Sequence, residues 1–393
     1  MSAQTILPGT TATGQQTTLG VMGGGQLGRM FVQAAQSMGY FTAVLDPDPA
    51  SPAGLISHYH VQADYLNEQG LAQMMQRCAA ITTEFENVPA GAMLTLGAHR
   101  PVAPAASALR IAQDRIKEKA HFASCGVPCA PCVALTDEAQ LADVTDDLLP
   151  GILKTARLGY DGKGQLRVAD RAALQAAWTQ LQGVPCVLEK QLPLAAECSV
   201  IVARGWDGAM VDFPVQRNVH HDGILATTEV FKGNLPAALA TQAVDAARAV
   251  ARGLEYVGVL CVEFFVVQGS DTLLVNEIAP RPHNSGHYTI DACDQSQFDL
   301  QVRTLAGLPL VQPRQHSPAI MLNLLGELWL QRAPAAPDWA GVLALPGVHL
   351  HLYGKLSARA GRKMGHVTVT GETVDQARTT AAQVAAVLGL PAL

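Results

Sequence analysis

Hydrophobic and polar positions near the start of the chain follow a regular order. A short apolar run, TLGVM at 18–22, leads into a glycine-rich turn. The next residues place Met30, Ala34 and Met38 on one helical face, and a second apolar run, YFTAVLD, follows at 40–46. This order of strand, turn, helix and strand predicts a βαβ unit with a parallel sheet.

The pattern changes in the middle of the chain. Two helical stretches are predicted over 105–125, and the Pro-rich segment GVPCAPCVAL that follows them marks a domain boundary. Two strands around a glycine-rich tip are expected over 152–168. The patterns predict further strands over 187–189, 197–203, 210–215, 257–267 and 273–278, a helix over 235–254, and after Pro318 strands over 319–324, 348–352 and 366–370 before an Ala-rich helix.

These elements predict a multidomain protein that mixes α/β and α+β architecture. We expect a flexible tail over 1–17, an N-terminal α/β domain over 18–125, a large central domain over 126–318 and a small C-terminal domain over 319–393. A chain of 393 residues is long enough for several hydrophobic cores.

Composition excludes several classes of protein. Hydrophobic residues make up 49% and charged residues 15%, which excludes a disordered chain. Glu263 interrupts the longest apolar run, and the N-terminus lacks a basic region and an apolar stretch, so we expect no membrane span or signal peptide and a cytoplasmic protein. A net charge of −6 disfavours nucleic acid as a partner. The eight cysteines include one C-x-x-C pair and no second, which predicts reduced thiols and no zinc site.

The glycine-rich turn carries the first candidate chemistry. Gly23, Gly25 and Gly28 satisfy G-x-G-x-x-G between a strand and a helix, and Asp46 lies 18 residues past Gly28. The glycines let the backbone approach an anion, and the helix N-terminus offers free N–H groups. A dinucleotide, another ligand and a tight turn without any ligand all remain open.

Two carboxylates in apolar strands are the second candidate. Glu263 lies inside VGVLCVEFFVV, and Glu277 ends LLVNEI. Buried carboxylates on neighbouring strands need a positive partner, because bare buried charge costs several kcal/mol or more. Oxygen ligands, with the Asn276 amide beside them, suit Mg²⁺. The alternative is that each glutamate pairs with an arginine such as Arg281.

A phosphate site is the third candidate. Lys154 closes a strand, and a glycine-rich tip follows, made of Gly159, Tyr160, Asp161, Gly162, Lys163, Gly164 and Gln165. Such a flap can cover phosphates with its N–H groups, and it lacks the features of a Walker A loop. An ordinary flexible hairpin is the alternative. Backbone amides over 189–192 could pair with an adenine edge, with Glu197 accepting ribose hydroxyls.

A polar loop follows Glu277 directly. It contains Arg281, His283, Asn284 and His287, and two prolines stiffen it. Fixed polar groups beside a metal site are what a reacting anion needs. The alternative is a polar surface loop.

The order of these motifs resembles the ATP-grasp superfamily over 105–313, with a Rossmann-like domain before the grasp and a small domain after it. Within the superfamily, the strings are similar to those of the 5-(carboxyamino)imidazole ribonucleotide synthases of purine biosynthesis. They are GGGQLGRM, TEFENV, GYDGKGQ, NVHHDGI, APRPHNSGH and AGRKMGH. The related formate-dependent transformylases of glycinamide ribonucleotide typically have Glu at the place of Gln26 and Asp-Thr at the place of Asn284-Ser285.

The resemblance implies an ATP-dependent carbon–nitrogen ligase. ATP would phosphorylate bicarbonate to carboxyphosphate, and that species, or carbon dioxide released from it, would carboxylate the amine of 5-aminoimidazole ribonucleotide. The implied cofactors are ATP and Mg²⁺, with Mn²⁺ as an alternative ion. The family also implies a homodimer and a mobile lid over about 133–205.

The resemblance assigns roles residue by residue. For ATP it implies Arg115, Lys154, the flap 159–165, the adenine hinge of Glu189, Lys190, Gln191 and Leu192, the ribose contact Glu197, the phosphate-side His220, and Asn276 with Glu277. Glu263 and Glu277 would hold the metal, and Arg281, His283 and Asn284 would handle bicarbonate. For the ribonucleotide it implies Gln26, Glu84, Tyr160, Asp161, Lys355, Arg362 and Lys363, with Arg359 as an alternative to Arg362.

Three alternatives stay open. The first is a transformylase-like ATP-grasp enzyme. The second is an NAD(P)-dependent oxidoreductase built on the glycine turn and Asp46, which leaves Glu263, Glu277 and the flap unexplained. The third is a nucleotide-binding module without catalysis. No general base follows from the residues: His283 is one candidate, and the phosphate released from carboxyphosphate is another. The pairs His58/His60 and His349/His351 are expected on solvated strand faces.

Overall fold

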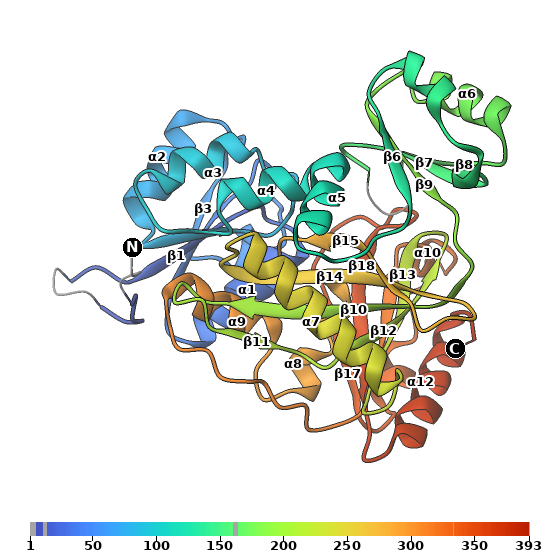
Figure 1. The fold of residues 1–393 in the computed structure, drawn as a ribbon. Helices are drawn as coiled ribbons and strands as arrows, with labels where there is room; N and C mark the ends of the chain where they lie inside the picture. The colour runs from blue at the N-terminus through green and yellow to red at the C-terminus, as the bar shows by residue number, and fades with distance from the viewer. Residues whose placement is uncertain (1–4, 11–13, 160–163, 333, 393) are drawn as a thin grey trace.

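The computed structural model describes residues 5–10, 14–159, 164–332 and 334–392. Three bodies surround a common centre (Figure 1): an N-terminal domain, a small lid, and a large sheet that runs on into the C-terminal region. In these ranges no helix is both long and apolar enough to cross a membrane.

The N-terminal domain is a five-stranded parallel sheet in the order β3-β2-β1-β4-β5. Its strands are β1 (Thr18–Met22), β2 (Phe41–Leu45), β3 (Tyr59–Val61), β4 (Ala80–Thr83) and β5 (Val102–Ala103), and its helices are α1 (Gln26–Ser37), α2 (Glu68–Arg77), α3 (Ala90–Gly97) and α4 (Ala106–Ala112). All five residues of β1 are buried, because helices cover both faces of the sheet. This is why β1 is a continuous apolar run, as strands in parallel sheets are.

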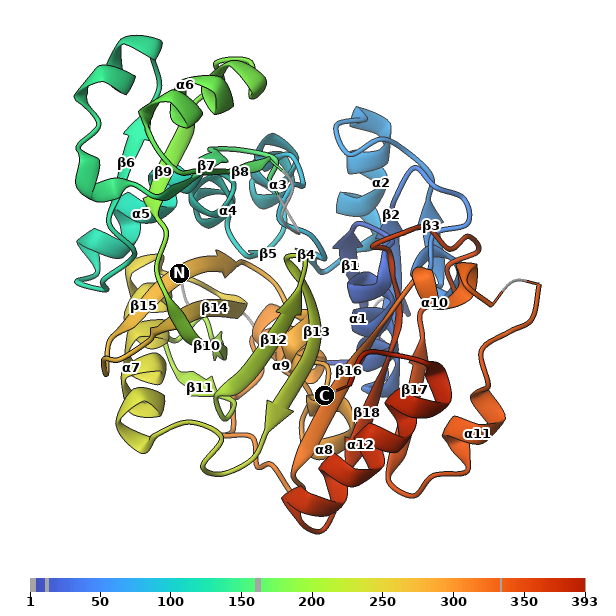
Figure 2. The same ribbon diagram turned by 90° about the vertical axis from the view of Figure 1, so that its right-hand side faces the viewer.

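The lid is a four-stranded antiparallel sheet in the order β6-β9-β7-β8. It contains β6 (Cys132–Leu135), β7 (Gly151–Thr155), β8 (Gln165–Val168), β9 (Cys186–Lys190) and α6 (Arg171–Gln180). Leu153, Leu174 and Trp178 belong to its own small core, and the lid stands apart from the other bodies at the top of Figures 1 and 2. The family resemblance predicted a lid that ends near residue 205. In the structure the lid ends at Lys190, because the next strand pairs with the large sheet.

The large sheet has nine strands, with the order β15-β14-β10-β12-β13-β16-β18-β17 and β11 paired to β10. The strands are β10 (Leu194–Arg204), β11 (Met210–Asp212), β12 (Gln216–His221), β13 (Ile224–Val230), β14 (Gly258–Val267), β15 (Leu273–Ala279), β16 (Ala319–Leu325), β17 (Val348–Leu352) and β18 (Lys363–Thr370). Every neighbouring pair is antiparallel. The helix α7 (Ala237–Gly253) packs on this sheet through an alanine- and valine-rich stripe.

Two other helices connect the bodies. The helix α9 (Gln297–Ala306) buries Val302 and Leu305 against Phe31 of α1, which joins the large sheet to the N-terminal domain. The helix α5 (Arg115–Ser124) contacts β9, α7 and β15. The helix α5 therefore places polar residues such as Arg115 and Glu118 where the three bodies meet.

The C-terminal region continues the large sheet. The strand β13 pairs with β16, so the predicted boundary between residues 318 and 319 is crossed by a ladder that starts at Val230 and Ala319. The helix α12 (Val374–Leu388) covers this end of the sheet with Ala381, Val384 and Leu388 (Figure 2). The C-terminal region therefore extends the large sheet and has a hydrophobic core of its own.

The described part of the predicted tail is attached to the N-terminal domain and to the end of α9. The Ile6 N–H donates to the Ala306 carbonyl at 2.8 Å, and the Tyr40 hydroxyl donates to the Ile6 carbonyl at 2.7 Å. Thr10 and Gln16 form a β-bridge. The sequence pattern gave no sign of this, because the contacts of Ile6 come from residues that are distant along the chain.

Candidate functional site

The three bodies enclose one large cleft with a volume of about 1090 Å³. It collects most of the residues that the sequence singled out: Gln26, Glu84, Arg115, Lys154, Gly159, Gln165, Glu197, His220, Glu263, Asn276, Glu277, Arg281, His283, Asn284, His287, Lys355, Arg362 and Lys363, together with Arg359. Gly164 and the hinge residues 189–192 do not line it. Tyr160, Asp161, Gly162 and Lys163 lie outside the described residues.

Two lysines and one glutamate form a buried cluster at the wall of the cleft that Lys154 lines. Glu189 accepts from Lys154 Nζ at 2.6 Å and from Lys119 Nζ at 3.0 Å. Its side chain is only 4% exposed. Burial raises the pKa of Glu189, but the charges of Lys154 and then Lys119 outweigh it and leave that pKa at about 2. The cluster therefore carries one net positive charge, which suits an anion.

This cluster changes the expected role of Glu189 and adds a residue that the sequence did not indicate. The Glu189 carboxylate serves the two lysines, so the hinge can offer a nucleotide only backbone groups. Lys119 stands in the run RIKEK, which looks like a solvated helical face. The packing of α5 against β9 and β15 buries it, and its Nζ also donates to the Asn276 carbonyl at 2.8 Å.

The hinge itself is fixed by backbone hydrogen bonds. The Lys190 N–H donates to the Pro131 carbonyl and the Gln191 N–H to the Pro150 carbonyl, both at 2.9 Å. Within the described chain, the Leu192 N–H makes no backbone hydrogen bond. It is therefore the amide of this segment that remains for a ligand.

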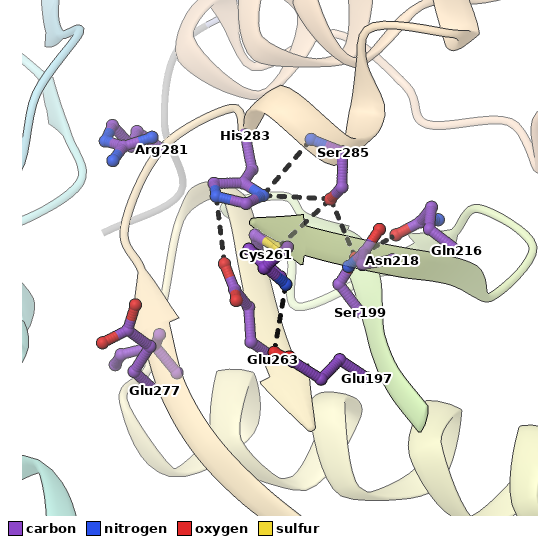
Figure 3. A network of polar contacts seen from close by, with 12 residues as sticks. Glu197, Ser199, Gln216, Asn218, Cys261, Glu263, Glu277, Arg281, His283 and Ser285 are labelled. Atoms are coloured by element: carbon purple, nitrogen blue, oxygen red, sulfur yellow. Dashed lines mark hydrogen bonds and ion pairs between the residues drawn. The ribbon is translucent and has the colours of Figure 1, made fainter. Parts of the chain in front are cut away.

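An irregularity between two strands brings the predicted metal ligands together. Val262 pairs with Ile278 and Phe264 with Val275, so Glu263 of β14 lies opposite both Asn276 and Glu277 of β15. Figure 3 shows the two glutamates on these neighbouring strands. Two carboxylates with an amide beside them form an oxygen-rich donor set, which fits a hard cation such as Mg²⁺.

One of these carboxylates pairs with an arginine, as the alternative expected, but that arginine is not Arg281. Glu277 pairs with Arg115 at 3.0 Å, and Glu263 lies 3.0 Å from Nε2 of His283. Arg281 instead donates through Nε to Glu86. Burial raises the pKa of Glu86, but Arg281 outweighs it and lowers the pKa to about 2. Glu86 is a second residue that the sequence reasoning missed, although it belongs to the string TEFENV.

Two further predicted residues form a pair of their own. Nδ1 of His220 lies 3.1 Å from Oε2 of Glu197, on the adjacent strands β12 and β10. Burial lowers the pKa of His220, but Glu197 more than offsets this and raises it. The Asn284 side chain is buried, and both of its polar atoms lack a partner among the described residues. Asn284 is thus available to a ligand in the cleft.

An internal carboxylate occupies the anion position of the glycine-rich turn. Glu84 accepts from the Gly25 N–H at 2.5 Å and from the Gly28 N–H at 2.8 Å. Asp46 accepts from the Gly24 N–H at 2.7 Å. The dinucleotide hypothesis is therefore wrong, because the N–H groups and the acidic residue that a pyrophosphate and a ribose would use are bonded within the protein. The turn holds Glu84 at the edge of the cleft.

Basic residues from the C-terminal region line the opposite edge. Lys355, Arg359, Arg362 and Lys363 all face the cleft. Burial, and after it the positive charge of Arg362, lower the pKa of Lys355 to about 8. Concentrated positive charge in a chain of net charge −6 indicates a site for an anionic group.

The strand histidines have structural partners. His351 Nε2 lies 2.8 Å from Asp291, and His349 Nδ1 lies 3.6 Å from the same carboxylate, so this pair is not the solvated face that the pattern predicted. The rings of His351 and His366 stack at 4.5 Å with an interplanar angle of 12°.

Known proteins resemble this chain over nearly its whole length. The ribonucleotide synthetase preATP-grasp domain matches residues 16–113, the ATP-grasp domain 120–298, and the phosphoribosylaminoimidazole carboxylase C-terminal domain 319–380. N5-carboxyaminoimidazole ribonucleotide synthase of Brucella melitensis is 44% identical over 359 residues, which cover 90% of this chain and 96% of that protein. The protein of the same name from Pseudomonas aeruginosa is 42% identical, covering 89% and 94%.

Solved structures agree with these relatives. The ADP complex of an N5-carboxyaminoimidazole ribonucleotide synthetase superposes with a TM-score of 0.87 at 36% identity and covers 97% of both chains. The N5-carboxyaminoimidazole synthase of Aspergillus clavatus, in complex with ADP and 5-aminoimidazole ribonucleotide, superposes with a TM-score of 0.85 at 32% identity. That match covers 95% of this chain and 98% of the other.

Proposed function

The chain belongs to the N5-carboxyaminoimidazole ribonucleotide synthases of the ATP-grasp superfamily, and from this we propose how its cleft performs their reaction. The enzyme carboxylates 5-aminoimidazole ribonucleotide with bicarbonate at the expense of ATP, in purine biosynthesis. The products are the carboxyamino ribonucleotide, ADP and phosphate. The family, fold and activity expected from the sequence motifs are thereby confirmed.

One observation carries the assignment of roles within the cleft. Three features border a single cavity: the buried cationic cluster, the pair of strand carboxylates and the basic edge. The cluster suits a triphosphate, the carboxylates suit a divalent cation, and the basic edge suits a phosphate monoester. We assign ATP to the space between the lid and the large sheet. Arg115 and Lys154 would hold its phosphates, with Lys119 adding positive charge behind them, and the hinge 190–192 would hold its adenine.

Glu263 and Glu277 would hold Mg²⁺, with Asn276 beside them. The ion would neutralise charge that develops on the transferred phosphoryl group. The protein side of this site is already ordered, because Arg115 and His283 fix the two carboxylates. Glu197 and His220 would face the nucleotide from the adjacent strands.

Arg281, His283 and Asn284 would bind bicarbonate. Glu86 holds Arg281 in place, and the unpartnered Asn284 amide is free to contact a small planar anion. The basic edge formed by Lys355, Arg359, Arg362 and Lys363 would take the phosphate of the ribonucleotide. Gln26 and Glu84 would then face its ribose and imidazole.

The remaining assignments follow from the family resemblance. We propose that the enzyme is a cytoplasmic homodimer, which light scattering of the purified protein and cell fractionation would test. A transformylase-like activity on glycinamide ribonucleotide is the runner-up. An oxidoreductase is disfavoured by Glu84, which fills the glycine-rich turn.

The test is ADP release from MgATP and bicarbonate, with and without 5-aminoimidazole ribonucleotide. We expect strong stimulation by that ribonucleotide. Stimulation only by formate with glycinamide ribonucleotide would transfer the assignment to the transformylases. A lack of turnover under both conditions would favour a nucleotide-binding module without catalysis.

A further inference from the structure

The strand that carries Glu277 lies at the edge of the large sheet. On one side β15 pairs with β14. Along its other side the described residues form no further strand, only an isolated bridge between Cys129 and Val275. The helix α5 packs against β15 (Figure 1). Backbone groups of β15 that point away from β14 need partners from outside the sheet, because an unpaired buried backbone group is costly.

Two side chains of α5 provide such partners on either side of Glu277. Lys119 Nζ donates to the Asn276 carbonyl at 2.8 Å. Oε1 of Glu118 accepts from the Ile278 N–H, also at 2.8 Å. The donor and the acceptor are unambiguous in both contacts, since an ammonium and a backbone N–H can only donate. The helix therefore holds the backbone directly before and directly after Glu277.

A third side chain of the same helix holds the Glu277 carboxylate. Arg115 pairs with it at 3.0 Å. Arg115, Glu118 and Lys119 have the i, i+3 and i+4 spacing that places side chains on one helical face. The functional assignments give roles to Arg115 and Lys119 but none to Glu118, although Glu118 is buried and lines the cleft.

The Glu118 contact lies at the point where the pairing of β15 is irregular. Asn276 and Glu277 together lie opposite Glu263, and the ladder resumes at Ile278. The extra residue of such an irregularity has no ladder partner, so regular pairing alone does not fix the backbone there. The hydrogen bond from Ile278 to Glu118 therefore fixes the end of the irregular segment and, with it, the direction of the Glu277 side chain.

We propose that Glu118 is a positioning residue for the divalent cation. Its carboxylate accepts from the exposed edge of β15 and holds the backbone of Glu277, and Glu118 is not itself a metal ligand. The inference rests on the proposed function, because Glu277 holds Mg²⁺ only if the cleft binds MgATP. The contact between Glu118 and Ile278 is a property of the enzyme without ligands.

Two substitutions separate the hydrogen bond from the charge. Glu118→Gln removes the negative charge but keeps a side-chain oxygen that can accept from the Ile278 N–H. Glu118→Leu has a similar size and no acceptor. Asp294→Leu is the matched control, because Oδ1 of Asp294 accepts from the Arg314 N–H at 2.8 Å and neither residue lines the cleft. It removes the same kind of contact at a distance from the site.

The first experiment observes the contact without any metal. The full-length enzyme is labelled with ¹⁵N at isoleucine, and hydrogen exchange of the Ile278 amide is followed by NMR. The spectrum of Ile278→Val identifies its signal. We expect slow exchange in the wild type, in Glu118→Gln and in Asp294→Leu. Exchange should be roughly tenfold faster in Glu118→Leu, because the amide loses its acceptor.

The second experiment measures the cation directly. Mn²⁺ serves as the probe, and EPR reports its free concentration in the presence of the enzyme and of ADP kept below the enzyme concentration. Glu118→Leu should weaken Mn²⁺ binding roughly tenfold, and Glu118→Gln by no more than about twofold. Asp294→Leu should bind Mn²⁺ as the wild type does. The KM for 5-aminoimidazole ribonucleotide should stay unchanged in all three variants, because its phosphate is assigned to the basic edge.

Three results would overturn the inference. The first is an Ile278 amide that exchanges in the wild type as fast as the amides of exposed loops. The second is wild-type Mn²⁺ affinity in Glu118→Leu. The third is equal weakening in Glu118→Gln and Glu118→Leu, which would assign the effect to charge.

Two further outcomes are kept apart from these. If Glu118→Leu does not fold, Ile278 exchange in the wild type and Mn²⁺ binding by Glu118→Gln still decide the inference. A wild-type enzyme without ribonucleotide-stimulated ADP release would contradict the proposed function, and Ile278 exchange would still decide whether Glu118 holds the strand.

Discussion

Glu189 shows how single residues of this cleft depend on their partners. Its carboxylate is surrounded by Lys119 and Lys154, and together they place one net positive charge in a nearly dry environment. Removing one member of such a cluster leaves an uncompensated buried charge, which typically costs about 3–5 kcal/mol. The cluster therefore contributes to folding as well as to anion binding.

The pKa of Glu189 predicts a pH dependence of stability. The folded-state pKa of about 2 lies below the usual value of 4.5, so the stabilisation is present above about pH 4.5 and is lost as the pH falls toward 2. The shift corresponds to about 3 kcal/mol. We expect denaturant unfolding to show a difference between wild type and Glu189→Gln that shrinks across this range.

Glu138→Gln is the control for this prediction, because it removes an exposed carboxylate from the same lid. Its unfolding free energy should follow that of the wild type at every pH. A difference between wild type and Glu189→Gln that stays constant from pH 7 to pH 3 would contradict the assigned pKa.

Glu277→Gln tests the proposed metal site. Loss of a ligand carboxylate should lower kcat for ADP formation by roughly 100-fold or more, because the ion supplies several kcal/mol of charge stabilisation. The fold should survive, since the Glu277 side chain is 41% exposed. Steady-state kinetics and thermal unfolding are the measurements, with the exposed Glu372→Gln as control. Full turnover by Glu277→Gln would remove Glu277 from the site.

Among the elements, the strand pair β14 and β15 positions the chemistry most directly. Its irregular register puts two consecutive residues, Asn276 and Glu277, opposite Glu263. Irregularities of this kind redirect side chains beside active sites. A regular ladder would give Glu263 a single partner, so the cluster of ligands depends on this local departure from regular pairing.

The start of helix α1 depends on the glycine-rich turn that precedes it, because side chains would not fit there. A Cβ at Gly28 would stand 2.7 Å from the Gly23 carbonyl oxygen, which is backbone and cannot move aside. Gly28→Ala should therefore lower the unfolding free energy by about 1–3 kcal/mol. Because the same turn holds Glu84, we also expect a higher KM for the ribonucleotide. Thermal unfolding and kinetics measure the two effects.

Gly91 provides the matched control on another helix. It lies in α3, and a Cβ there would meet no atom within 4 Å. Gly91→Ala should be neutral or stabilise the protein by up to about 1 kcal/mol. Equal destabilisation by both substitutions would argue against the close contact at Gly28.

At the scale of the whole molecule, the active site exists only where three bodies meet. The N-terminal domain contributes Gln26, Glu84 and Glu86, the lid contributes Lys154, and the sheet extension contributes the basic edge. The ion pair between Glu86 and Arg281 joins the N-terminal domain to the polar loop that follows Glu277. The site is therefore sensitive to how these bodies are arranged.

The basic edge predicts a pH dependence of substrate binding. With a pKa of about 8, Lys355 loses its charge as the pH rises from 7 to 9. The KM for 5-aminoimidazole ribonucleotide should rise roughly tenfold over this range, as one charged hydrogen bond to its phosphate is lost. Lys355→Met should have a high KM at every pH, and the exposed Lys232→Met should behave as wild type. A pH-independent KM in the wild type would exclude this role for Lys355.

Local patterns in the chain determined the strands, the glycine-rich turn and the residues facing the cleft. Apolar runs such as 18–22 and 257–267 must be buried in any fold. Polar motifs such as 279–287 can be recognised without knowledge of the residues that surround them in space. The pattern also distinguished the carboxylate pair, since charged residues are rare inside apolar strands.

Only the tertiary structure decided which residues became partners. Lys119 and Glu189, Glu86 and Arg281, and Glu84 with the glycine turn are each separated by dozens of residues or more. Strand pairing likewise moved β10 from the expected lid into the large sheet. The reason is physical: a residue's own neighbours along the chain set its burial and backbone preference, whereas hydrogen-bond and ion-pair partners are set by how distant elements pack.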